Sequence, residues 1–243
     1  MGTNFSGNSL PKKITPCPIM EAIVEFRFDS PFPHDSIFGI IYNAFREDYA
    51  DVQELPILQL PEIVRKKDPL LLFKPYYKLA SKDNFLLQVG ARVISLISCN
   101  PYCGWSVFSE RLNNLIQKVA ELSIISSYTR VGIRYINGFD CNILEHINLT
   151  LNMRDKQISD RVTFIQMDCP SNSFISTLRI TNNAKIKKES SNTNGSIIDI
   201  DTYIENPGSD LAKVINEGHL EEKKLFFDLV KHEFVKKNLN PEY

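Results

Sequence analysis

One segment near the middle of the chain, Tyr128–Asp140, constrains the fold more than any other. Its apolar residues alternate with charged or small ones, which is the period of a half-buried β-strand. The alternating sets are Val131, Ile133 and Tyr135 against Arg130, Gly132 and Arg134. The segment therefore predicts one long strand with a core face and a charged face.

A weaker copy of this strand opens the chain at Glu21–Asp29. When Arg27 is placed on Arg134, the letters EFRF fall on GIRY. The match indicates two related halves, each begun by an arginine-bearing strand. We expect a flexible N-terminal tail at 1–15, a first half at 16–125 and a second half at 126–243, folded as one compact unit.

The order of the expected elements is the same in both halves. In the first half, a helix at 35–49 follows the lead strand, then come strands at about 70–80, 84–89 and 92–98 and a helix from Trp105 to Leu122. In the second half, a short helix or irregular piece at Asn142–Leu151 follows the lead strand, and strands at about 161–168, 173–182 and 196–204 precede a closing helix at 209–237. The polar segment Asn182–Gly195 reads as a mobile hairpin loop between two of these strands. The expected fold is therefore α+β, a tandem β-α-β-β-β-α repeat with a curved antiparallel sheet covered on one face by long helices.

Composition excludes some classes of function. The net charge of −1 over 243 residues argues against bulk nucleic-acid binding, which needs a positive excess. No apolar run is long enough for a membrane span, and the N-terminus does not resemble a secretory signal. The five scattered cysteines have no metal-ligand spacing, so free thiols in a cytoplasmic protein are expected.

Several motifs together resemble a known family. They are PIMEAIVEFRF, YYKLASKDNFLLQVGARVISLI, the GW-x2-F entry to the middle helix, TRVGIRYIN and IDIDTYIE. The chain resembles a sporadically distributed family of bacterial and archaeal proteins of about 250 residues whose function is unassigned. The resemblance supplies no activity, and its patchy distribution suggests defence-linked genes. The matching positions are Glu21, Glu25, Arg27, Trp105, Arg130, Arg134, Tyr135, Asn137 and His219.

The charged face of the two lead strands is the main candidate site. If these strands are neighbours, Glu25 can pair across them with Arg130 or Arg134. Two interpretations stay open: the arginines bind an anion by bidentate hydrogen bonds, or they form an ion-pair ladder that fixes the strand register. The ladder predicts a carboxylate for every arginine, whereas an anion site predicts an unpaired guanidinium that faces a cavity. With the motif positions included, the candidate ligand-binding residues are Glu25, Arg27, Arg130, Arg134, Tyr135 and Asn137.

Other groups are weaker candidates. Asp199 and Asp201 share one strand face, and they could bind a metal or serve as partners for Arg179. Cys103 precedes a helix start, and Lys74–Lys78 interleaves lysine with tyrosine in a way that could contact nucleic acid. The four histidines have no partner at zinc or triad spacing. No phosphate-binding glycine loop, catalytic residue, cofactor or metal site is predicted.

The sequence thus favours a non-enzymatic binding or interaction protein over an enzyme. It would use the sheet face or a sheet edge to hold a protein partner or a small anionic ligand, and it could be a homodimer. The alternative is a nucleic-acid-binding accessory protein or RNA-processing enzyme, for which Lys74, Lys78, Arg65–Lys67 and Lys185–Lys188 would form one positive stripe.

Overall fold

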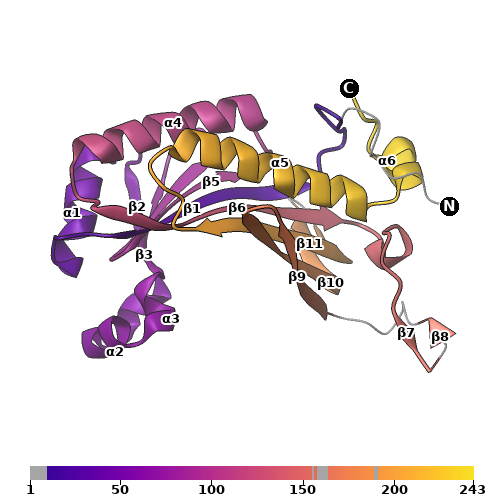
Figure 1. Cartoon of the computed structure of the whole chain (residues 1–243), viewed down its shortest axis with the longest axis horizontal. Helices are drawn as coiled ribbons and strands as arrows, with labels where there is room; N and C mark the ends of the chain where they lie inside the picture. Colours follow the sequence, from indigo (N-terminus) through magenta and orange to yellow (C-terminus); the bar gives the residue numbers. More distant parts are fainter. Residues whose placement is uncertain (1–9, 155, 158–163, 189–190) are drawn as a thin grey trace. The chain divides into compact units, whose positions relative to one another are not determined.

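The computed structural model describes residues 10–154, 156–157, 164–188 and 191–243 (Figure 1). The chain divides into two compact units that interleave along the sequence. Unit 1 comprises Met1–Met20, Arg134–Thr202 and Glu217–Tyr243, and unit 2 comprises Glu21–Ile133 and Tyr203–Asn216. Each unit is described by itself.

Runs of neighbouring strands are separated by helices along the described residues. Those up to the middle of the chain are β1 (Ile19–Asp29), α1 (His34–Phe45), β2 (Asp51–Glu54), the 3-10 helix η1 (Pro56–Gln59), α2 (Glu62–Lys67), α3 (Pro69–Leu72), β3 (Pro75–Ala80), β4 (Phe85–Gly90), β5 (Val93–Cys99), α4 (Trp105–Glu121) and β6 (Ser127–Phe139). Those after it are η2 (Ile143–Glu145), β7 (Asn152–Met153), β8 (Lys156–Gln157), β9 (Phe164–Ser171), β10 (Phe174–Lys188), β11 (Ser191–Glu205), α5 (Leu211–Leu229) and α6 (His232–Asn238).

Antiparallel pairing organises both units. In unit 2 the strand order is β2-β3-β4-β5-β1-β6, and in unit 1 it is β6-β11-β10-β9. Figure 1 shows α4 on one face of the unit 2 strands and α2 and α3 on the opposite face. The α+β class with an antiparallel sheet is confirmed, whereas the tandem repeat and the cover of one face by long helices stay predictions.

Every second side chain of β1 from Ala22 to Phe28 is buried in the core of unit 2. Its residues Ala22, Val24, Phe26 and Phe28 are buried, while the residues between them are half-buried. Helix α4 buries Phe108, Leu112, Leu115 and Val119, which recur at helical spacing on one side. Burial of such side chains stabilises the fold by about 1.5–3 kcal/mol each.

The expected strand at 70–80 begins later than predicted. Pro69–Leu72 form α3 instead, and β3 starts at Pro75. The reason is a helix-start signal, because the Asp68 side chain accepts a hydrogen bond from the Leu70 backbone N–H and Pro69 occupies the first helical position. The apolar run LLL alone did not distinguish a strand from a helical turn.

The expected closing helix at 209–237 is two helices, α5 and α6. The break lies at Val230, which forms a bridge with Ile147. Asn148 N–H donates to the Leu229 carbonyl, and Lys231 N–H donates to the His146 carbonyl. A segment distant in the sequence therefore satisfies the backbone groups that would otherwise continue the helix.

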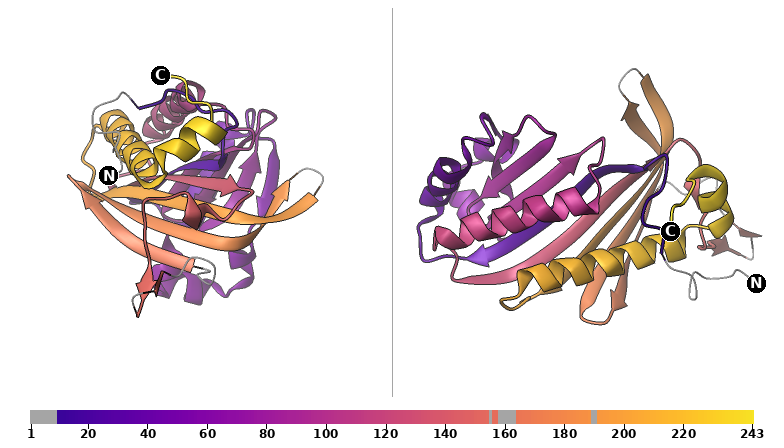
Figure 2. Two further views of the ribbon diagram at one scale, coloured as in Figure 1. Left: turned by 90° about the vertical axis from the view of Figure 1, so that its right-hand side faces the viewer. Right: turned by 90° about the horizontal axis from the view of Figure 1, so that it is seen from above.

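The segment Asn182–Gly195 was expected to be a mobile hairpin loop, and it does join two strands as a hairpin, but its described residues are strand and not loop. Strands β10 and β11 extend through most of this segment as a long hairpin (Figure 2), with residues 189–190 outside the described ones. The composition is polar, but backbone pairing does not depend on apolar side chains. The polar composition of this segment therefore indicated a loop where the chain forms strands.

Unit 1 has its own core between its strands and α5 and α6. The buried cluster includes Phe139, Ile198, Ile200, Phe226 and Val235. Leu10 and Ile14 from the expected N-terminal tail pack against it, and Lys12 N–H donates to the Glu242 carbonyl. The described part of that tail is thus joined to the C-terminal segment, and residues 1–9 lie outside the described residues.

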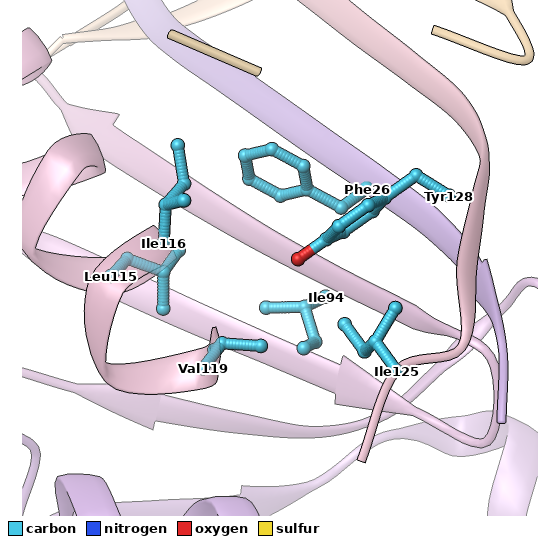
Figure 3. Close-up of a pocket in the computed structure, with 7 residues that line it drawn as sticks. All are labelled: Phe26, Ile94, Leu115, Ile116, Val119, Ile125 and Tyr128. Atoms are coloured by element: carbon cyan, nitrogen blue, oxygen red, sulfur yellow. The ribbon is translucent and has the colours of Figure 1, made fainter. Parts of the chain in front are cut away.

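A small cavity lies under α4 in unit 2 (Figure 3). Its volume is about 10 Å³, and its lining is apolar apart from the Tyr128 hydroxyl. The ring of Tyr128 packs edge-on against Phe26 at a centroid distance of 6.0 Å. The volume is that of about one water molecule, but an apolar lining gives a water too few hydrogen-bond partners.

Filling this cavity should stabilise unit 2. A Val119→Ile variant adds one methyl group to a lining side chain of α4, and we expect a gain of about 0.5–1 kcal/mol in the free energy of unfolding. Urea denaturation measures the change. The matched control is Val107→Ile on the same helix, where the side chain is 49% exposed and no gain is expected. A loss of stability in Val119→Ile would mean that the site is already filled.

Candidate functional site

Glu25 is the centre of an ion-pair cluster in unit 2. Its Oε1 accepts a hydrogen bond from Arg27 Nε at 2.8 Å and another from an Nη atom of Arg130 at 2.9 Å. Arg130 comes from β6, the neighbour of β1, and its guanidinium stacks on the Tyr203 ring at 4.2 Å. The predicted cross-strand pairing of Glu25 with an arginine is therefore present.

Strand register extends this cluster into a polar row across unit 2. Ser95 lies opposite Glu25, Gln88 lies opposite Ser95, and Lys78 lies opposite Gln88. Residues directly opposite in antiparallel strands project from the same face. We call this set, with Gln53 opposite Lys78, the polar row: Gln53, Lys78, Gln88, Ser95, Glu25 and Arg130.

The α2–α3 segment lies on the same face as the polar row. Arg27 is two residues from Glu25 on β1, and its guanidinium lies 5.0 Å from the centre of the Phe73 ring, just after α3. Arg65 of α2 lies 4.8 Å above the ring of Tyr76, which is two residues from Lys78 on β3. Two cation–π contacts thus hold this segment against the polar face of unit 2.

Arg27 has donor capacity beyond its ion pair. It uses Nε for Glu25, and neither Nη atom makes a hydrogen bond to any residue that the structure describes. Its side chain is 33% exposed. Lys78 likewise has no carboxylate within ion-pair distance in the described part of the chain. Because a guanidinium carries five N–H donors, Arg27 can bind a further acceptor without leaving Glu25.

Unit 1 contains a second polar row with its own carboxylate. Arg134 donates to both carboxylate oxygens of Asp199 through Nε and an Nη atom, each at 2.7 Å. Arg179 approaches Asp199 at 3.7 Å, and its Nε donates to Gln166, its register partner on β9, at 3.1 Å. The four arginines of these two clusters are Arg27, Arg130, Arg134 and Arg179. Each of them contacts a carboxylate, as the ladder interpretation predicts, and none of the four is the unpaired guanidinium that the anion interpretation expected.

Tyr135 and Asn137 belong to a different environment from the arginines. Both are about 2% exposed, and alternation along β6 directs them away from the face of Arg134. Tyr135 Oη lies 3.2 Å from His219 Nδ1 on α5, and Asn137 Nδ2 donates to the Ile198 carbonyl. The predicted set of six residues thus divides into arginine clusters and a buried group beneath α5.

Two ionisable side chains of α5 have strongly shifted pKa values. Burial lowers the pKa of His219 to about 3, with a further lowering from Lys223. Burial raises the pKa of Glu222 to about 8, although Lys223 opposes the shift. At neutral pH, His219 is therefore uncharged and Glu222 is largely protonated. Both residues lie on the core side of α5, three positions apart.

The other sequence candidates show no catalytic arrangement among the described residues. Those residues contain no group of three or more His, Cys, Asp or Glu side chains arranged for a metal ion. All five cysteines are free thiols, as predicted, and Cys103 Sγ lies 3.4 Å from Ser98 Oγ. Asp199 is a partner of Arg179, which is one of the two roles expected for it. No described helix could cross a membrane.

The sequence matches no protein-family model and no curated protein. The family resemblance drawn from its motifs therefore stays a prediction. Sequence reasoning identified the arginines but missed Gln53, Gln88 and Ser95, which reach the site through strand register. The alternation of each strand contained part of this signal, but the pairing partners could not be read from single strands.

Proposed function

We propose that this chain is a non-enzymatic binding protein that holds a small anionic ligand on the polar face of unit 2. The anion is a phosphate or carboxylate bound at the terminal nitrogens of Arg27. The observation that carries the proposal is the unused donor capacity of this half-exposed arginine, on the same face as Lys78 and Arg130. In this proposal the ion pairs set the strand register and also hold the binding arginine.

The geometry of the cluster suits an oxyanion. Glu25 fixes the Arg27 guanidinium through Nε, so less side-chain freedom is lost when the two Nη atoms bind a ligand. Contact with Phe73 shields one side of the guanidinium from water. Charge-assisted hydrogen bonds from a planar guanidinium to two oxygens of one anion are the strong type, at about 1.5–3 kcal/mol each.

Phosphate titration of the Arg27→Gln variant tests this proposal. We expect inorganic phosphate to shift backbone amide NMR signals of β1 and β3 in the wild-type protein, with affinity at least about tenfold weaker in the variant. Added sodium chloride should weaken the binding because the site is partly exposed. The control is Arg46→Gln at the end of α1, an exposed arginine outside the polar row, which should bind phosphate normally. Equal affinity in all three proteins would refute the proposal.

A protein partner is the second candidate, and exposed apolar side chains favour it. Leu60, Ile63, Val64 and Leu70 of the η1–α3 segment are 41%, 62%, 43% and 79% exposed. Such clustering is typical of interaction surfaces. If the partner is a second copy of this chain, sedimentation velocity should show a concentration-dependent dimer that Leu70→Lys removes. A monomer at every concentration would exclude this homodimer.

The nucleic-acid alternative makes a different prediction. Lys74, Lys78 and Arg65 lie in unit 2, whereas the side chains of 186–188 lie outside the described residues. Binding of this kind would fall steeply with salt, in proportion to the number of phosphates contacted. A short single-stranded oligonucleotide that binds with the same Arg27 dependence as inorganic phosphate would favour this alternative.

A further inference from the structure

A groove in unit 2 lies away from the polar row, where the end of α1 meets α4. Its volume is about 430 Å³, within the range of about 300–1,000 Å³ common for small-molecule sites. Helix α4 contributes residues three or four positions apart, so they form one stripe. The lining residues are Phe45, Asp48, Tyr49, Arg111, Asn114, Leu115, Gln117, Lys118 and Glu121.

Tyr49 is the most informative side chain of this groove. It is 3% exposed, yet its hydroxyl makes no hydrogen bond to any residue that the structure describes. Burial raises the pKa of Tyr49 to about 12, and nearby Asp83 and Asp48 add to this effect while Arg111 opposes it. This hydroxyl is not one of the fully buried polar atoms without a partner, which among the described residues are His34 Nδ1 and Thr129 Oγ1, so it reaches solvent at the groove and a ligand bound there can form a hydrogen bond to it.

The charges of the groove favour a neutral ligand. Lys118 pairs with Asp48 at 2.9 Å and lies over the Phe45 ring, and Arg111 pairs with Asp83 and lies over the Phe85 ring. Both cations are therefore already matched by carboxylates. The exposed Glu121 adds a negative charge at the rim, which disfavours an anion.

We propose that this groove binds a small, neutral, hydroxyl-rich molecule such as a sugar, with the Tyr49 hydroxyl as its hydrogen-bonding anchor. Asn114 and Gln117 supply amides that both donate and accept, which matches alternating hydroxyl groups. This site is separate from the anion site of the proposed function, because α1 and α4 lie outside the polar row.

Ligand-observed NMR on the full chain tests the inference, with D-glucose and myo-inositol as probes and glucose 6-phosphate as the anionic comparison. We expect saturable binding of at least one neutral probe below about 50 mM, with glucose 6-phosphate weaker than glucose. Amide shifts should map to residues 45–49 and to α4. Tyr49→Phe removes only the hydroxyl and should weaken binding at least about fivefold.

The matched control is Tyr42→Phe on α1, whose ring stacks on Phe38 outside the groove and whose loss of a hydroxyl should change nothing. Arg27→Gln should also bind the neutral probe normally, which separates this site from the phosphate site. Absence of saturable binding by both neutral probes, or equal affinity in Tyr49→Phe and the wild-type protein, would overturn the inference. Tighter binding of glucose 6-phosphate than of glucose would overturn it as well.

Discussion

A Glu222→Gln variant should be more stable than the wild-type protein by about 3 kcal/mol near pH 7 and about equally stable near pH 4. Glu222 is 5% exposed on the core side of α5, and burial raises its pKa to about 8. Between the ordinary pKa of glutamate and this value, the folded protein binds a proton that the unfolded chain releases. Stability is therefore fully present below the ordinary pKa and is lost as pH rises through about 8. Glutamine has a similar shape and cannot ionise, so it removes this loss.

His219 affects the same dependence of stability on pH, at its acidic end. Its pKa is lowered to about 3, so its contribution is present above the ordinary histidine pKa and is lost as pH falls toward 3. The two opposite slopes should cancel between about pH 4.5 and 6.5 and leave a plateau there, followed by a decline to about pH 8. Urea denaturation across this range measures the profile. The control Glu233→Gln, at an exposed position of α6, should follow the wild-type curve. A Glu222→Gln curve parallel to wild type would show that Glu222 does not retain its proton.

An Asp199→Asn variant should lose about 2–3 kcal/mol of stability at neutral pH. Asp199 accepts two hydrogen bonds from Arg134 and also approaches Arg179, and its side chain is only 11% exposed. The substitution keeps the shape but removes the charge that both guanidinium groups face. Breaking a largely buried ion pair costs more than the pair contributes, because the remaining charges stay partly desolvated.

Chemical denaturation at pH 7 measures this loss. Added salt should reduce the difference between variant and wild type only slightly, because the carboxylate is shielded from solvent. The control is Asp228→Asn on α5, an exposed aspartate for which a change below about 0.5 kcal/mol is expected. If both variants were equally stable, the arginine row of unit 1 would not hold its strands together.

Local sequence patterns predicted the strands and helices in which apolar residues recur with a clear period. The alternation at 128–140 and 21–29 gave β6 and β1, and the apolar stripe of the middle helix gave α4 almost to its bounds. The errors lie where contacts between residues distant in the sequence determine the secondary structure. The end of α5 depends on backbone hydrogen bonds from residues 146–148, and the long β10–β11 hairpin depends on pairing that its polar composition does not reveal.

The candidate site was predictable to the extent that side chains on one strand determine it. Glu25, Arg27 and Arg130 were expected together because two similar strands were assumed to be neighbours, and they are. The polar row required the register of four further strands, which no single segment encodes. Glu222 was missed because a glutamate on a helix is normally solvated, and only the packing around α5 shows that it is buried.

The most direct test of the anion site is the NMR signal of the Arg27 side chain during titration with inorganic phosphate. With selectively labelled arginine, the Nη–Hη resonances of Arg27 should shift and saturate along the same curve as the amides of β1. The resonances of Arg46, exposed at the end of α1, should stay in place. If the Arg27 signals remain unchanged up to about 50 mM phosphate, the polar face of unit 2 is a structural ion-pair network and not a ligand site.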